Sequence, residues 1–300
     1  MSIFKKKKIC VTHNGAFHPD DIFATAALSI LEKGNIKIIR TRDPKIISKG
    51  DYVYDVGGEY DGVRFFDHHQ KGGAGTRENG IPYSSFGLIW RSFGEKICGS
   101  REVAEYLDKK IVQTIDADDN GIDLSLSRKD MKAFTISDIV YFFRPTLGEE
   151  QNQEEIAYDK FFKKTVSIFK DILNRNITKA QDLFKSISFL KDLYQKSKDK
   201  KIIILDKKYS WQDFFTEYPE PIYVITPRVD GTWKVESVRK SKFTFESRKM
   251  FPESWAGKRD KELADVTGIS DAIFCHNGRF MVVAKSKESA IKLAQKALLA

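Results

Sequence analysis

Cysteine is scarce in this 300-residue sequence, and long apolar segments are absent from it. The three cysteines, Cys10, Cys98 and Cys275, are far apart and odd in number, which argues against a disulfide framework or a cysteine zinc knuckle. No window reaches the ~18 consecutive apolar residues that a membrane-spanning helix needs, and the N-terminus lacks the apolar core of a signal peptide. We therefore expect a protein of the reducing cytoplasm without a membrane partner.

Histidine is also scarce, whereas positive charge is in excess. Four of the five histidines lie between residues 13 and 69, beside or near aspartates. The net charge of +9 permits binding to a polyanion such as nucleic acid, but the lysines are spread along the whole chain and single out no patch. The composition therefore directs attention to the segment that holds the four histidines.

Strand and helix patterns alternate in the first half of the chain. The expected strands are 8–12, 36–40, 52–56 and 63–66, and the expected helices are 22–34, 83–97, 101–117 and 131–143. This alternation predicts an α/β domain with a mainly parallel, doubly wound sheet. Ligands of such sheets gather at the carboxyl ends of the strands, so the residues that follow each strand are the first candidates for a site.

The second half of the chain predicts a change of architecture. Residues 148–155 are acidic and lack an apolar period, as in a linker, and two helices are expected at 156–173 and 178–197. Short strands and a closing helix at 287–299 then indicate a smaller α/β unit. The expected parts are a catalytic domain over 1–150, a helical connector over 151–198 and a C-terminal domain over 199–300.

The run Asp67-His68-His69 is the strongest local pattern, directly after the strand at 63–66. Where a strand ends, the chain turns and adjacent side chains can converge on one point. A helix cap or a salt-bridged surface cluster is the alternative. Two adjacent histidines from a total of five favour a metal site or a proton-transfer site.

Two further sets follow other predicted strands. His13, His18 and Asp20 lie on a strand-to-helix loop, where compact spacing can aim them inward, although Asp20 or Asp21 can also simply cap the helix. Asp55 ends a buried strand and precedes two glycines that let the backbone approach a ligand. An ordinary turn aspartate is the alternative there.

A fourth set, Asp116, Asp118 and Asp119, ends the helix expected at 101–117. A helix C-terminus disfavours carboxylates, so a cation nearby would explain them, and solvated acids are the alternative. Together the sets mix imidazole and carboxylate without thiolate, which suits Mn²⁺, Mg²⁺ or Co²⁺ better than structural zinc. The ligands suffice for two ions about 3.5–4 Å apart, which can share a hydroxide and clamp a phosphoryl displacement, with Asp55 as the natural bridge.

The same residues form long, ordered motifs that resemble one family. The motifs are His13–Asp20, Arg40–Asp43, Asp55–Tyr60, Asp67–Gln70, Asp116–Gly121, Ser254–Asp260 and Phe274–Phe280. They look like the melanocyte-proliferating-gene family, also called UPF0160, and extend over nearly the whole chain. The resemblance implies the DHH superfamily of metal-dependent phosphoesterases, which includes RecJ-type nucleases and family II pyrophosphatases.

The resemblance also implies a role for each site residue. The implied metal ligands are His13, His18, Asp20, Asp55, His68 and Asp116, with Asp119 as a rival for the last position. His69 would touch the phosphoryl group, and Asp67 would orient its neighbour. The C-terminal domain would close over the site.

Substrate contacts are expected from both parts of the chain. The candidates are Arg42, His276, Asn277, Gly278 and Arg279, because arginine can grip a phosphate with two hydrogen bonds. For Arg279 a surface hairpin position is the alternative, and Arg40 and Arg42 could instead pair with acids. The aromatic residues Trp211, Phe214, Phe215, Trp233 and Trp255 could stack on bases, but we expect them in the core.

These patterns and the resemblance predict a metal-dependent phosphodiesterase. The expected activity is a 3′-5′ exonuclease on RNA that uses a hydroxide bridging two divalent ions, Mn²⁺ first. One alternative is a small-substrate phosphoesterase acting on short oligonucleotides, cyclic dinucleotides or pyrophosphate. Another is a non-catalytic RNA-binding protein, whose hallmark would be missing ligands, and none of the expected ligands is replaced here.

Overall fold

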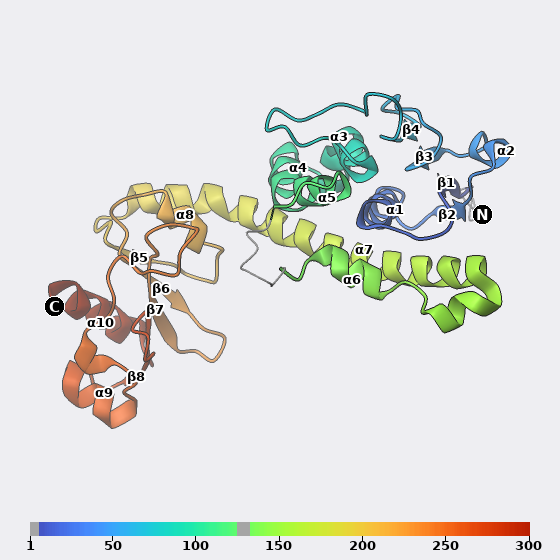
Figure 1. The fold of residues 1–300 in the computed structure, drawn as a ribbon. Helices are drawn as coiled ribbons and strands as arrows, with labels where there is room; N and C mark the ends of the chain where they lie inside the picture. Colours follow the sequence, from blue (N-terminus) through green and yellow to red (C-terminus); the bar gives the residue numbers. More distant parts are fainter. Residues whose placement is uncertain (1–5, 125–132) are drawn as a thin grey trace, which may run out of the picture. The chain divides into compact units, whose positions relative to one another are not determined.

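The computed structural model describes residues 6–124 and 133–300, with the side chains of 152–155 left aside. Figure 1 shows its helices and strands. The chain divides into two compact units, Met1–Gln181 and Asp182–Ala300, and each is described by itself. The three-part division over 1–150, 151–198 and 199–300 stays a prediction.

The first unit contains a four-stranded sheet in which every pairing is parallel. Its strands are β1 (Lys8–Thr12), β2 (Ile36–Arg40), β3 (Tyr52–Tyr54) and β4 (Phe65–Phe66), in the order β2-β1-β3-β4. The parallel sheet and the α/β class predicted from the sequence are confirmed. Because β1, β3 and β4 are neighbours, the residues that follow them meet at one edge of the sheet.

Helices complete the first unit. They are α1 (Pro19–Leu31), α2 (Pro44–Ile47), α3 (Ser85–Cys98), α4 (Arg101–Leu107), α5 (Gln113–Asp119) and α6 (Ile136–Phe142), with a π-helical turn at Asp108–Val112. Helix α1 packs against α3, where the Phe23 and Phe86 rings lie 5.3 Å apart. Of the helix predicted at 131–143, residues 131 and 132 lie outside the described part of the chain.

A single helix, α7 (Leu147–Lys196), replaces the linker and the helix pair predicted from the sequence. The predicted linker at 148–155 is wrong, because the helix begins at Leu147 and the Glu149 carboxylate accepts from the N–H and the hydroxyl of Thr146, the residue before it. The predicted break at 174–177 is also wrong. There the Asn176 and Thr178 side chains hydrogen bond to helix carbonyls one turn back, and neighbouring apolar residues are buried.

The second unit contains a mixed five-stranded sheet in the order β5-β6-β7-β9-β8. The strands are β5 (Ile202–Ile204), β6 (Tyr223–Pro227), β7 (Trp233–Ser237), β8 (Ala272–Cys275) and β9 (Met281–Ala284). The helices are α8 (Gln212–Thr216), a 3₁₀ turn at Glu253–Trp255, α9 (Asp260–Thr267) and α10 (Lys287–Leu299). Only β5 and β6 pair in parallel among the described strands of this sheet.

Aromatic residues form much of the second unit's core. Trp211, Phe215 and Trp255 are buried, and Phe214 and Trp233 pack against the same apolar clusters. Their expected place in the core is confirmed. Across the described part of the chain, no helix has both the length and the apolarity required to cross a bilayer.

Candidate metal centre

Histidines and aspartates converge where three neighbouring strands end. His13 follows β1, Asp55 follows β3 and Asp67 follows β4. His18, the residue before helix α1, and Asp20, in its first turn, join them, and the end of α5 adds Asp119. The parallel sheet therefore gathers the predicted residues from distant parts of the sequence.

Asp55 lies at the centre of this cluster and faces three histidines. One carboxylate oxygen lies 3.1 Å from His13 Nε2, and the other lies 3.5 Å from His68 Nε2 and 3.4 Å from His69 Nδ1. Burial opposes ionisation, but the hydrogen bonds with His13 and His68 outweigh it and hold the pKa of Asp55 below its usual value. Each oxygen is thus directed to a different side, as in a bridging carboxylate.

Asp55 also adopts a strained backbone conformation, with φ at 55°. The left-handed region is unfavourable for a non-glycine residue, at a cost of roughly 1–3 kcal/mol when surrounding structure enforces it. The two glycines that follow also have positive φ, and Gly58 N–H donates to Asp67. The tight turn after β3 therefore fixes Asp55 in place.

His13 is held in a defined orientation by its neighbours. Its Nδ1 lies 3.0 Å from the Asn14 carbonyl, which leaves Nε2 for the cluster, 3.2 Å from Asp21 Oδ2. Burial lowers the pKa of His13, but hydrogen bonds to Asp21 and Asp55 outweigh it and raise the pKa to about 10. Asp21 also caps α1 by accepting a hydrogen bond from His18 N–H, a role that the sequence predicts. Its contact with His13 has no signal in the sequence.

Asp20 provides the clearest test of whether a cation fits. Its carboxylate is wholly buried, and neither oxygen has a hydrogen-bond partner among the described residues. Burial, together with the charges of Asp55 and Asp119, raises the pKa of Asp20 well above its usual value. A buried carboxylate without a donor is costly unless a cation is near, so this donor set fits a metal ion.

Three overlapping groups of side chains could each hold an ion. In each group the ligand atoms lie within 4.8 Å of one another. The groups are His13, His18 and Asp55; Asp55, His68 and His69; and His18, Asp20 and Asp119. Asp55 and His18 each belong to two of the three groups. The mixture of imidazole and carboxylate suits divalent ions such as Mn²⁺.

Both carboxylate oxygens of Asp67 accept hydrogen bonds from nearby residues. Its Oδ1 lies 2.8 Å from His69 Nδ1 and also accepts from the backbone N–H groups of His68 and His69. This bond raises the pKa of His69, whose side chain is 63% exposed. Asp67 therefore orients His69, the position expected from the sequence for an orienting residue.

Asp116 lies apart from the cluster, contrary to its first-choice place among the expected ligands. Its Oδ1 accepts from Ser84 N–H and Oγ–H and from Gly87 N–H, and its Oδ2 pairs with Arg77. A cation was expected near the carboxylates at this helix end, and Arg77 is that cation. One turn later on α5, Asp119 Oδ2 lies 3.2 Å from His68 Nε2, so the rival residue occupies the cluster.

A cavity of about 350 Å³ opens on the cluster. Its lining residues are His13, His18, Arg42, Asp55, Val56, Gly57, Gly58, Asp67 and His69. Arg42 thus shares the cavity with predicted ligands. Arg40 does not: its guanidinium pairs with Asp159 and packs over the Phe162 ring at 4.5 Å.

The other predicted substrate contacts, His276, Asn277, Gly278 and Arg279, lie in the second unit between β8 and β9. Gly278 N–H donates to His276 Nδ1, and Arg279 has φ at 54°. The His276 ring lies 4.2 Å from that of Phe280. The structure describes a formed turn here, and contact with a substrate stays a prediction.

The fold and the cluster define an α/β protein with a candidate His/Asp metal centre. Residues 8–298 match the family described as uncharacterised protein family UPF0160, and the chain belongs to this family. It is 30% identical over 314 residues to a MYG1 protein of Schizosaccharomyces pombe, covering 96% of each chain. It is 31% identical to the human protein named MYG1 exonuclease, covering 96% of this chain and 85% of the relative. The family resemblance seen in the sequence is confirmed.

Proposed function

We propose that this chain is a metal-dependent phosphodiesterase, a 3′-5′ exonuclease that acts on RNA. The arrangement of Asp55 carries the proposal, because its two oxygens face different histidines and the buried Asp20 carboxylate has no donor among the described residues. The human relative's name supports a nuclease. We also propose that the family belongs to the DHH phosphoesterases, since the run Asp67-His68-His69 contributes two histidines to the site.

We propose that two divalent ions, Mn²⁺ in the first instance, bind at this cluster. The ligands would be His13, His18, Asp20, Asp55, His68 and Asp119, with Asp119 in place of Asp116. Bound there, the ions would lower the pKa of a shared water to give a bridging hydroxide and offset charge on the phosphoryl group. Asp55 would bridge the two positions.

The chain's own side chains would position the substrate. Asp67 occupies His69 Nδ1, so Nε2 is the ring atom of His69 left for a phosphoryl oxygen. Arg42 lines the same cavity and would offset the charge of the phosphate there. His276, Asn277, Gly278 and Arg279 are the substrate contacts that we propose within the second unit. The division into a catalytic domain, a connector and a C-terminal domain belongs to the same proposal, as does the cytoplasmic setting.

A small-substrate phosphoesterase uses the same metal chemistry and differs in what it accepts. Its rate would be highest on dinucleotides, cyclic dinucleotides or pyrophosphate and would fall with chain length. An exonuclease instead keeps its rate on long RNA and releases mononucleotides. Rates measured on a series of RNA lengths with Mn²⁺ therefore separate the two.

Hydrolysis of labelled RNA with Mn²⁺ tests the proposal. We expect RNA labelled at the 5′ end to shorten stepwise, and we expect Asp55→Asn to lower the rate at least a hundredfold because both ion positions lose their shared carboxylate. Asp265→Asn, at an exposed position on α9, is the matched control and should leave the rate unchanged. Intact RNA under all conditions would refute the exonuclease, and an unchanged rate in Asp55→Asn would refute the mechanism.

A further inference from the structure

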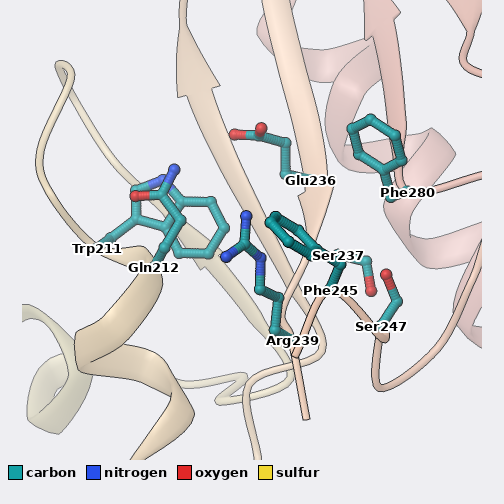
Figure 2. A pocket seen from close by; sticks show the side chains of 8 residues that line it. All are labelled: Trp211, Gln212, Glu236, Ser237, Arg239, Phe245, Ser247 and Phe280. Atoms are coloured by element: carbon teal, nitrogen blue, oxygen red, sulfur yellow. The ribbon is translucent and has the colours of Figure 1, made fainter. Parts of the chain in front are cut away.

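The second unit contains a cavity of its own, with a volume of about 270 Å³. It lies between the start of α8, strand β7 and the hairpin loop that follows β7 (Figure 2). Its lining residues are Trp211, Gln212, Glu236, Ser237, Arg239, Phe245, Ser247 and Phe280. None of them belongs to the candidate metal centre or to the substrate contacts predicted from the sequence.

Aromatic rings and one guanidinium dominate this cavity. Figure 2 shows the Arg239 guanidinium beside the Phe245 ring, with Trp211 also lining the cavity. The Arg239 guanidinium carbon lies 4.6 Å from the centre of the Phe245 ring. Trp211 is 3% exposed, whereas Phe245 is 87% exposed. An aromatic ring beside a guanidinium offers a face for stacking and a charge for an anion.

Phe245 is presented by a short hairpin. Arg239 pairs with Ser247 in an antiparallel bridge, and Lys240 N–H donates to the Glu246 carbonyl at 2.8 Å. The backbone thus holds the two ends of the loop together. Phe243, at the tip of the same hairpin, is 88% exposed but does not line the cavity.

Arg239 differs from the other basic side chains around it. Lys240 pairs with Glu246, Arg248 donates to three backbone carbonyls, and Lys249 Nζ donates to the Leu298 carbonyl. Glu236, which also lines the cavity, lies 2.7 Å from Lys234 Nζ. For Arg239 no ion pair or side-chain hydrogen bond occurs with any described residue, so its charge remains for a ligand.

We propose that this cavity binds one nucleotide of single-stranded RNA, with the base stacked on Phe245 and the phosphate on Arg239. Gln212 and Ser247 would meet the polar edge of the base. Stacking on aromatics beside arginine is how proteins bind single strands with little sequence preference. The volume is slightly below the roughly 300 Å³ of the smallest common ligand sites, which suits one nucleotide.

The choice of RNA as the ligand rests on the proposed nuclease function, whereas the binding mode rests on the cavity. Phe280 lines the cavity and directly follows the predicted contacts His276–Arg279, so the two surfaces adjoin within the second unit. The chain's net charge of +9 is complementary to the ligand. An apolar peptide is the competing ligand, and it would not need Arg239.

Binding of fluorescein-labelled single-stranded RNA, followed by fluorescence anisotropy, tests the proposal. All proteins carry Asp55→Asn so that the RNA stays intact. We expect Phe245→Ala and Arg239→Gln each to raise the Kd about tenfold, which is about 1.4 kcal/mol. The matched controls are Phe243→Ala, on the same hairpin, and Arg228→Gln, on the β6–β7 turn. Both should leave the Kd within about twofold.

An abasic oligonucleotide of the same length separates stacking from charge. We expect it to bind the parent protein more weakly than RNA does, and we expect that difference to disappear in Phe245→Ala. Equal Kd values for the parent, Phe245→Ala and Arg239→Gln would overturn the proposal. A parent protein that is folded by circular dichroism but binds no RNA would also overturn it. Binding of an apolar peptide unaffected by Arg239→Gln, without RNA binding, would also overturn it.

Failure of the nucleotide-site proposal must be distinguished from failure of the proposed nuclease function. Hydrolysis of bis(p-nitrophenyl) phosphate by proteins that retain Asp55 makes this distinction. Phe245→Ala should hydrolyse this small diester at the parent rate. Loss of hydrolysis in the parent itself would contradict the metal mechanism, while the anisotropy results would still decide on the nucleotide site.

Discussion

Two aspartates one turn apart on α5 have opposite surroundings. Asp116 accepts hydrogen bonds from Ser84 and Gly87 and pairs with Arg77, so its charge is compensated without any ion. Asp119 faces His68 within the cluster, and burial raises its pKa to about 6. Of the two, Asp119 is the carboxylate that gains from a nearby divalent cation.

Substitution of Asp116 and of Asp119 by asparagine, one at a time, shows which of the two residues binds the metal ion and which stabilises the fold. Asp119→Asn should weaken Mn²⁺ binding at least tenfold and leave the Tm of the metal-free protein unchanged or higher, because a buried charge is removed. Asp116→Asn should lower the stability by about 2 kcal/mol, since a buried guanidinium loses a partner. Calorimetric titration and thermal denaturation measure both. Weakened Mn²⁺ binding by Asp116→Asn at unchanged stability would reverse the assignment.

At the scale of elements, a partly buried hydrogen-bonded contact helps to connect α10 to the sheet of the second unit. Asp271, next to β8, accepts from both N–H and Oγ–H of Ser286, the residue that caps α10. Burial opposes ionisation, but the hydrogen bonds from Ser289 and Ser286 outweigh it and lower the pKa of Asp271. The ionised carboxylate therefore stabilises the start of the helix.

The stability contributed by Asp271 should depend on pH. Because its pKa in the folded protein lies below the usual 3.8, the contribution is present above that pH and is lost as the pH falls through the lower, folded-state value. Asp271→Asn should cost about 1 kcal/mol at neutral pH and less in acid. Urea denaturation at several pH values measures this. A cost that is the same at every pH would show that the charge has no part in it.

The sequence predicts the strand ends well and the long-range contacts poorly. The ligand positions after β1, β3 and β4 follow from apolar runs and the rule that parallel strands share one edge. The partnership of Arg77 with Asp116 spans 39 positions and depends on the path of a glycine-rich loop, which carries no periodic pattern. Helix α7 continues through Asn174–Ile177 because tertiary packing of Leu173 and Ile177 outweighs local propensity.

At the scale of the whole molecule, the two units offer different chemistry. The first holds the His/Asp cluster and Arg42, and the second holds the aromatic cavity with Arg239. The proposed metal chemistry and the proposed nucleotide binding should therefore be separable by substitution. A variant that loses one activity and retains its fold reports on one unit.

The central claim is that this cluster binds two divalent ions through Asp55. Titration of the metal-free protein with Mn²⁺, with calorimetry to count the bound ions, tests it most directly. We predict two Mn²⁺ per chain for the parent, a raised Tm on binding, and weaker binding in Asp55→Asn but not in Asp265→Asn. A folded parent protein that binds no Mn²⁺, Mg²⁺ or Co²⁺ would contradict the claim.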